Sequence, residues 1–176
     1  MNRLAALAAA LLVAGCATSP QQRAPQPAPR LLPPATPLPG VVSRETYVAQ
    51  AASIDLFVIR SSELALVRSP RAQVRSVASR LIETHQGTSA QLSFAGRRLN
   101  LLPPASMLPQ QQAMYDQLEA AADFDRAYVR LQRAAHGAAL SLHSNYARFG
   151  TSPTLRPVAA NAETVERDHL ALLARL

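Results

Sequence analysis

The positions of its prolines divide this chain into parts that can and cannot form long helices. Eight of the 14 prolines lie between Pro20 and Pro39. Proline lacks a backbone N–H and disrupts helix interiors, so long helices are confined to proline-free segments. The sequence therefore predicts a proline-rich segment followed by a helical domain over residues 41–176. Three long stretches of that domain contain no proline: 41–67, 71–101 and 110–151.

The composition favours helices and excludes several kinds of site. Aromatic residues make up only 5% of the chain and glycines number 6, which leaves little material for a sandwich or barrel of short strands. The single cysteine, Cys16, cannot form an internal disulfide or build a cysteine-based zinc or iron–sulfur site. The sequence also lacks a Ser-His-Asp order, a Gly-rich phosphate loop and a nucleophilic cysteine in the domain. We therefore expect no enzymatic activity.

Residues 1–15 have the plan of a secretory signal peptide. Arg3 precedes an apolar run over 4–13, and about ten apolar residues are too few to cross a bilayer core of ~30 Å. The segment Val13-Ala14-Gly15-Cys16 resembles the bacterial lipobox, in which the peptidase cuts before a lipidated cysteine. An ordinary signal peptide with a stray cysteine is the alternative. We expect lipidation of Cys16, because two or three acyl chains hold a protein on a membrane almost permanently.

Residues 16–40 are expected to tether the domain to the membrane. Pro, Ala, Gln, Thr and Arg dominate this segment, and such a composition cannot bury enough apolar surface to fold. Ala17 follows the cysteine, in place of the Asp that would resemble an inner-membrane retention signal. We therefore expect an outer-membrane lipoprotein that faces the periplasm. The sequence does not identify its protein partner.

The basic charge of the chain does not predict nucleic-acid binding. All 18 basic residues are arginines, against 11 acidic residues, and they are scattered singly apart from the pair Arg97-Arg98. An exported protein also works in a compartment without nucleic acid. We expect the arginines to cover solvated helix faces, with weak attraction to anionic lipid or lipopolysaccharide as the alternative.

Apolar residues recur at three- and four-residue steps through most of the domain, which predicts amphipathic helices. Five helices are expected: one that ends before Ser69-Pro70, one over 71–99, a short one over 110–122, one that begins near Asp123, and one that begins at Thr154. The buried stripe predicted for the fourth helix follows heptad spacing. Its members are Phe124, Tyr128, Leu131, Ala135, Ala138, Leu142, Asn145 and Phe149.

Four long helices with two tight links predict a four-helix bundle. The link between the second and fourth helices, over residues 100–122, is too long for a simple bundle turn and can cross the length of the bundle. Two helical hairpins joined by one crossover form the ferritin-like arrangement. We therefore expect an all-α, ferritin-like four-helix bundle. A simple up-down bundle and a dimer of hairpins are the alternatives.

Three histidines are predicted to lie at one level of the bundle. His85, His136 and His169 are each about 14 to 16 residues from the nearest hairpin turn. A lone buried histidine is more often a packing residue, but three at one level indicate a shared polar cluster. This cluster is either a hydrogen-bond network or a site for one transition-metal ion such as Zn, Cu or Fe. His143, one heptad after His136, is expected to be exposed.

Short segments spread over the domain match a pattern known from one bacterial family. They are Leu56-Phe57, Ser61-Ser62-Glu63-Leu64-Ala65, His85 with Ala78 and Leu81 upstream, Phe124-Asp125-Arg126-Ala127-Tyr128 followed by His136, and His169 in the last helix. Together they resemble the ferritin-like domain of unknown function numbered 4142, over about residues 41–176. Members of that family are often exported or outer-membrane proteins, and no activity is established for the family. The resemblance therefore implies a fold and a location, and implies no reaction.

The sequence departs from that family at two positions that bear on metal chemistry. Val58 stands where the resemblance implies a glutamate, and Thr84 stands where an aspartate commonly precedes the histidine. A di-iron oxidase of the ferritin type needs about four carboxylates and two histidines that converge in the core. We therefore do not expect a ferroxidase.

Two acids and one tyrosine are candidates for outer partners that orient the histidine rings. These are Asp125, Tyr128 and Glu166, the last of which forms Glu-x-x-His with His169. A carboxylate in a first helical turn also faces unpaired backbone N–H groups, and we favour this role for Asp125. The sequence as a whole favours a binding or structural role in the cell envelope. Metal storage or redox chemistry at the histidine cluster is the alternative.

Replacing Cys16 by Ser tests the membrane anchor. The variant has no thiol to accept lipid, so we expect the protein to leave the membrane fraction and appear in the soluble periplasmic fraction. Fractionation and immunoblotting of cells that produce the full chain measure this distribution, with the unaltered protein as the control. A variant that stays with the membranes contradicts the lipidated anchor.

Overall fold

Five helices make up the part of the chain that the structure, a computed structural model, describes, namely residue 40 and residues 42–176. They are α1 (Arg44–Arg68), α2 (Ala72–Arg97), α3 (Pro109–Glu119), α4 (Phe124–Phe149) and α5 (Leu155–Leu173). These residues contain no strand, so the all-α prediction and the five helix positions are confirmed. The predicted signal peptide (1–15) and the predicted tether (16–40), apart from Gly40, lie outside the described residues.

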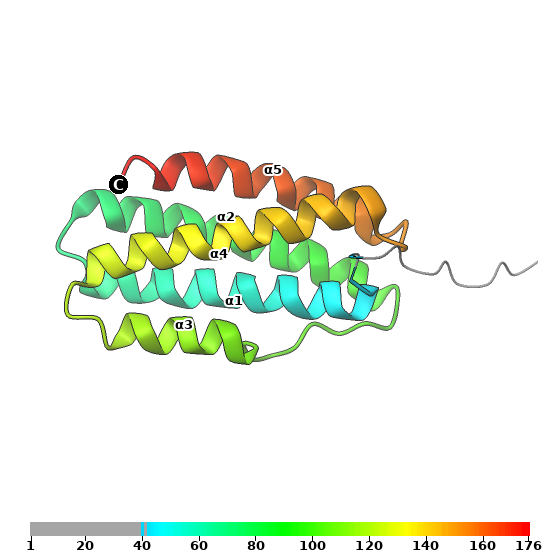
Figure 1. The fold of residues 1–176 in the computed structure, drawn as a ribbon, viewed down its shortest axis with the longest axis horizontal. Coiled ribbons are helices and arrows are strands. Elements are labelled where there is room, and N and C mark those ends of the chain that lie inside the picture. The colour runs from blue at the N-terminus through cyan, green and yellow to red at the C-terminus, as the bar shows by residue number, and fades with distance from the viewer. Residues whose placement is uncertain (1–39, 41) are drawn as a thin grey trace, which may run out of the picture. The chain divides into compact units, whose positions relative to one another are not determined.

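The four long helices form two hairpins that surround a common core. α1 pairs with α2 and α4 pairs with α5, while α1 also packs against α4 and α2 against α5 (Figure 1). α3 lies on the outside of the bundle, against α1 and α4. The connection from α2 to α4 therefore runs back along the bundle through α3, as Figure 1 shows. None of the described helices has the length and apolar character needed to cross a membrane.

Local signals in the sequence set where the helices begin and end. The side chains of Ser43 and Asp123 accept hydrogen bonds from backbone N–H groups in the first turns of α1 and α4. α1 ends just before Ser69-Pro70, since proline cannot continue a helix. α2 ends at Arg97, and the chain turns away from it through Asn100, a left-handed residue whose φ is 56°.

The apolar core is divided into two clusters by a polar level at mid-bundle. Between the clusters lie buried polar side chains from all four long helices, among them Asp55, His85, His136 and Glu166. Each long helix therefore carries apolar residues on both sides of the polar side chains that it contributes to this level. The larger members of one cluster are Phe57, Leu81, Leu118, Tyr128 and Leu131; those of the other are Tyr47, Leu92, Tyr146 and Leu155.

The buried face of α4 departs from the predicted heptad stripe after Ala135. Ala139, His143 and Tyr146 are buried, whereas the predicted core residue Phe149 is 50% exposed. A straight α-helix has 3.6 residues per turn, so a heptad stripe drifts by ~20° per heptad around it. Over the 26 residues of α4 this drift adds up to ~70°, which approaches the 100° between successive residues, so the buried positions in its second half shift by one residue. The expectation that His143 is exposed is wrong for this reason.

Ser53, buried on α1, fastens the outer connection to the bundle. Its hydroxyl donates a hydrogen bond to Gln111 Oε1 (3.0 Å) and accepts one from the backbone N–H of Leu108 (2.7 Å). Leu108 is the residue that caps α3. A single hydroxyl thus holds both the start and the first turn of α3 against α1.

Replacing Ser53 by Ala tests this attachment. The variant leaves the Leu108 N–H and the buried Gln111 amide without their partner, so we expect the free energy of unfolding to fall by about 1–3 kcal/mol. Urea denaturation of the full chain measures the change. The control is Ser79→Ala on the exposed face of α2, for which a change within about 0.5 kcal/mol is expected. Equal stability of the two variants contradicts the attachment.

Candidate metal centre

Four side chains that are common metal ligands meet at the polar level of the bundle. They are His85 from α2, His136 from α4, and Glu166 and His169 from α5, here called the His/Glu cluster. All four are buried, and their nearest ligand atoms lie within 4.8 Å of one another. The imidazole ring centroids are 5.2, 5.2 and 5.3 Å apart. The structure thus brings the three predicted histidines together and places Glu166 among them instead of outside them.

Hydrogen bonds to the surrounding helices orient two of the rings. His85 Nδ1 lies 2.7 Å from Asp55 Oδ1, and His136 Nδ1 lies 2.8 Å from the backbone carbonyl oxygen of Gln132. A carbonyl can only accept, so the Nδ1 of His136 carries the proton, and its Nε2 presents a lone pair. In both histidines Nδ1 is engaged in a hydrogen bond to a neighbouring group, so Nε2 is free to face the cluster.

The inner atoms of the cluster have no hydrogen-bond partner among the described residues. Most buried polar atoms in proteins have one, and an unpaired buried acceptor destabilises the fold. His136 Nε2 and Glu166 Oε2 lie 3.9 Å apart, which is beyond hydrogen-bonding distance. The cluster is therefore not an internally hydrogen-bonded network. The unpaired atoms are His85 Nε2, His136 Nε2, His169 Nδ1 and Glu166 Oε2.

Burial makes the cluster unfavourable for isolated charges. It lowers the pKa of His136 well below 6.5, where repulsion from His85 adds to the effect, and it lowers the pKa of His169 to about 4. Burial also raises the pKa of Glu166 to about 8. For His85, burial alone would lower the pKa, but the hydrogen bond and the charge of Asp55 outweigh it and raise the pKa. His136 and His169 are thus neutral at pH 7, the form in which imidazole binds metals.

Asp55 is the residue that sequence reasoning missed. Its carboxylate is buried on α1, where it binds His85 through Oδ1 and accepts hydrogen bonds from the hydroxyls of Thr88 (3.3 Å) and Ser89 (2.8 Å). The signal in the sequence was an acid four residues after Ala51, on the apolar stripe of the first helix.

Asp125 and Tyr128, which were expected from the sequence to orient the histidine rings, have other contacts in the structure. Asp125 lies in the first turn of α4, outside the cluster, and no hydrogen bond joins it to a cluster histidine in the described residues. The Tyr128 hydroxyl bonds Ser62 (2.9 Å), whose hydroxyl accepts from the Gln132 amide (3.1 Å). The carboxylate that orients a ring is therefore Asp55 and not Asp125, because Asp125 precedes His136 on α4 by about three turns.

His143 forms a separate buried pair with Tyr47. The Tyr47 hydroxyl and His143 Nδ1 are 3.0 Å apart, and Tyr146 stacks on the Tyr47 ring with centroids 4.0 Å apart. Burial lowers the pKa of His143 to about 4. This histidine contacts Tyr47 of the second apolar cluster and is not part of the His/Glu cluster.

The low pKa of His143 predicts a loss of stability in acid. Between pH 4 and 6.5 the unfolded chain binds a proton that the folded chain excludes, so the free energy of unfolding falls as the pH falls, by up to about 1.4 kcal/mol per pH unit for one proton. Urea denaturation of the metal-free full chain across this range measures the slope. In His143→Gln the slope should be smaller than in the unaltered protein, and equal slopes contradict the assignment.

Several solved structures share this fold. CopM in the Cu(II)-bound form has a TM-score of 0.65 and 16% identity, over 77% of this chain and 95% of that chain. A DUF305 fragment from Deinococcus radiodurans has a TM-score of 0.66 and 19% identity, over 82% of this chain and 100% of that chain. CopM in the apo form has a TM-score of 0.62 and 15% identity, over 76% of this chain and 95% of that chain. At such identities the likeness concerns the fold alone.

The sequence of the chain also matches a protein family. No curated protein matches the sequence. The family model of a domain of unknown function, DUF4142, matches residues 31–176, which include the whole described bundle and every residue of the His/Glu cluster. The chain therefore belongs to the DUF4142 family.

Proposed function

We propose that this protein binds and holds one transition-metal ion in the His/Glu cluster. The observation that carries the proposal is the set of four inner ligand atoms, all buried and all without a protein hydrogen-bond partner. Ligand atoms on one ion lie roughly 3–4 Å apart at metal–nitrogen distances of ~2.0–2.1 Å. The atoms of the cluster lie within 4.8 Å of one another, so small side-chain movements bring them to a common ion. Such an ion gives all four atoms a partner at once and displaces the protons that Glu166 and His85 carry.

The donor set supports copper as the first candidate and zinc as the second. Once the ion displaces the protons of Glu166 and His85, three imidazoles and one carboxylate suit Cu, Zn and Fe, whereas Mg and Ca prefer oxygen ligands alone. A di-iron centre is not proposed, because Glu166 is the only carboxylate in the cluster and Asp55 is engaged with His85. The fold neighbour CopM has Cu(I)-bound and Cu(II)-bound structures, which adds weight to copper here.

The closed ligand set supports a role in holding metal without catalysing a reaction. Catalytic metal sites keep an open position for water or substrate, whereas sites that only bind are filled by protein ligands. His85, His136 and Glu166 are almost fully buried, with exposed fractions of 0%, 0% and 1%. His169 lines a surface pocket between α2 and α5 and thus lies nearest to solvent.

We further propose that the bundle is ferritin-like and works in the bacterial envelope. Two hairpins joined by a connection that returns along the bundle support the ferritin-like architecture. The lipobox-like segment ending at Cys16 supports a lipid anchor, and Ala17 supports the outer membrane facing the periplasm. At that location the cluster would meet metal ions that enter the cell before they reach the cytoplasm.

Elemental analysis of variants tests the metal site. The full chain is incubated with Cu(II) or with Zn(II), passed over a desalting column and analysed for bound metal. We expect close to one ion per chain in the unaltered protein and at least a tenfold lower content in His85→Ala/His169→Ala. His143→Gln removes a buried histidine outside the cluster, so it should retain the metal.

Two results contradict the proposal. One is no retained metal in the unaltered protein, and the other is equal loss in His143→Gln and in the double variant. Circular dichroism establishes whether each variant is folded. If the double variant does not fold, Glu166→Gln supplies the comparison, because it keeps the shape of the side chain and cannot supply a carboxylate ligand.

A further inference from the structure

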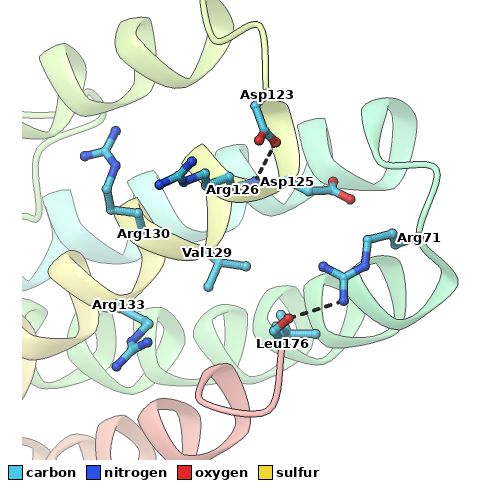
Figure 2. A pocket seen from close by; sticks show the side chains of 8 residues that line it. All are labelled: Arg71, Asp123, Asp125, Arg126, Val129, Arg130, Arg133 and Leu176. Carbon is cyan, nitrogen blue, oxygen red and sulfur yellow. Dashed lines mark hydrogen bonds between the residues drawn. The ribbon is translucent and has the colours of Figure 1, made fainter.

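One pocket at an end of the bundle gathers four arginines from separate segments. Arg71 precedes α2, whereas Arg126, Arg130 and Arg133 belong to α4 (Figure 2). We call this the arginine pocket. Its remaining lining residues are Asp123, Asp125, Val129 and Leu176.

The three arginines of α4 form a line of positive charge that is not tied up in ion pairs. Their spacing of four and three residues places them on one face of the helix, where like charges repel. All three are exposed, and none forms an ion pair or donates a side-chain hydrogen bond within residues 42–176. By contrast, Arg148 and Arg167 on α4 and α5 share the carboxylate of Glu163. The arginine pocket thus gathers four arginines against two acids, and its three α4 arginines form no ion pair with either acid in the described part of the chain.

The other charged groups of the pocket do not neutralise this line. Asp123 is engaged as the cap of α4, where it accepts a hydrogen bond from the backbone N–H of Arg126 (3.1 Å). Arg71 donates to the main-chain oxygen of Leu176 (3.2 Å). In Figure 2, Asp125 lies toward Arg71 and Asp123 lies beside Arg126, whereas Arg130 and Arg133 lie on the opposite side of Val129 from Asp125. The guanidinium groups of α4 are therefore the ones free to contact a ligand.

Guanidinium groups in this arrangement suit a phosphoryl group. Each guanidinium presents a rigid fork of N–H donors that pairs with two oxygens of a phosphate. A phosphoryl group offers several oxygens around one centre, so it can accept from more than one arginine at a time. A carboxylate has two oxygens in one plane and is a poorer match to three arginines that follow each other along a helix.

We propose that the arginine pocket binds a phosphoryl group, carried by free phosphate or by the headgroup of an anionic phospholipid. The site is separate from the His/Glu cluster and shares no residue with it. Binding is electrostatic in origin and therefore weakens as salt is added.

Titration of the full chain with inorganic phosphate tests the proposal. Isothermal titration calorimetry at low ionic strength compares the unaltered protein with Arg126→Gln/Arg130→Gln/Arg133→Gln. The matched control is Arg60→Gln/Arg97→Gln/Arg98→Gln, which removes the same charge from exposed positions outside the pocket. We expect the dissociation constant to rise at least tenfold in the pocket variant and less than threefold in the control.

Sedimentation with vesicles distinguishes the two sources of the phosphoryl group. One set contains phosphatidylglycerol and phosphatidylcholine, and the other contains phosphatidylcholine alone. If only the pocket variant loses binding to the anionic vesicles, the headgroup is a ligand; if both variants bind them equally while phosphate binding is lost in the pocket variant, the ligand is free phosphate. The proposal is overturned if both variants weaken equally in both assays, or if the unaltered protein binds neither phosphate nor anionic vesicles.

Discussion

The hydrogen bond between Asp55 and His85 is the contact on which the geometry of the polar level depends. At 2.7 Å it commits the Nδ1 of His85 to α1, and the hydroxyls of Thr88 and Ser89 complete the bonds of the carboxylate. The Nε2 of the ring must then face the centre of the bundle. His136 is fixed in the same way by the carbonyl of Gln132. The helices around the cluster thus orient these two rings, and the centre remains available to a cation.

The apolar clusters on either side of the polar level favour the uncharged forms of its side chains. They exclude water from both directions along the bundle, which keeps His136 and His169 neutral and favours the protonated form of Glu166. A purely apolar level would make a more stable bundle, because unpaired buried acceptors destabilise it. A local cost of this kind is typical of positions that a protein uses for binding.

The sequence predicted the helices and the level of the three histidines, because both follow from proline positions and from distances to turns. It did not predict Asp55, whose partner His85 lies on another helix thirty residues away, nor the burial of His143, which depends on the drift of a 3.6-residue helix against a heptad stripe. The arginine pocket was also missed. Arg71 approaches the line on α4 only through the packing of the two hairpins, which no local pattern encodes.

X-ray absorption at the copper K edge of the copper-loaded full chain tests the central claim most directly. We expect scattering from imidazole rings with nitrogen or oxygen ligands at ~2.0–2.1 Å, and we expect the imidazole signal to disappear in His85→Ala/His169→Ala. Copper bound without imidazole scattering, or with the same spectrum in that variant, would contradict a metal site built from the His/Glu cluster.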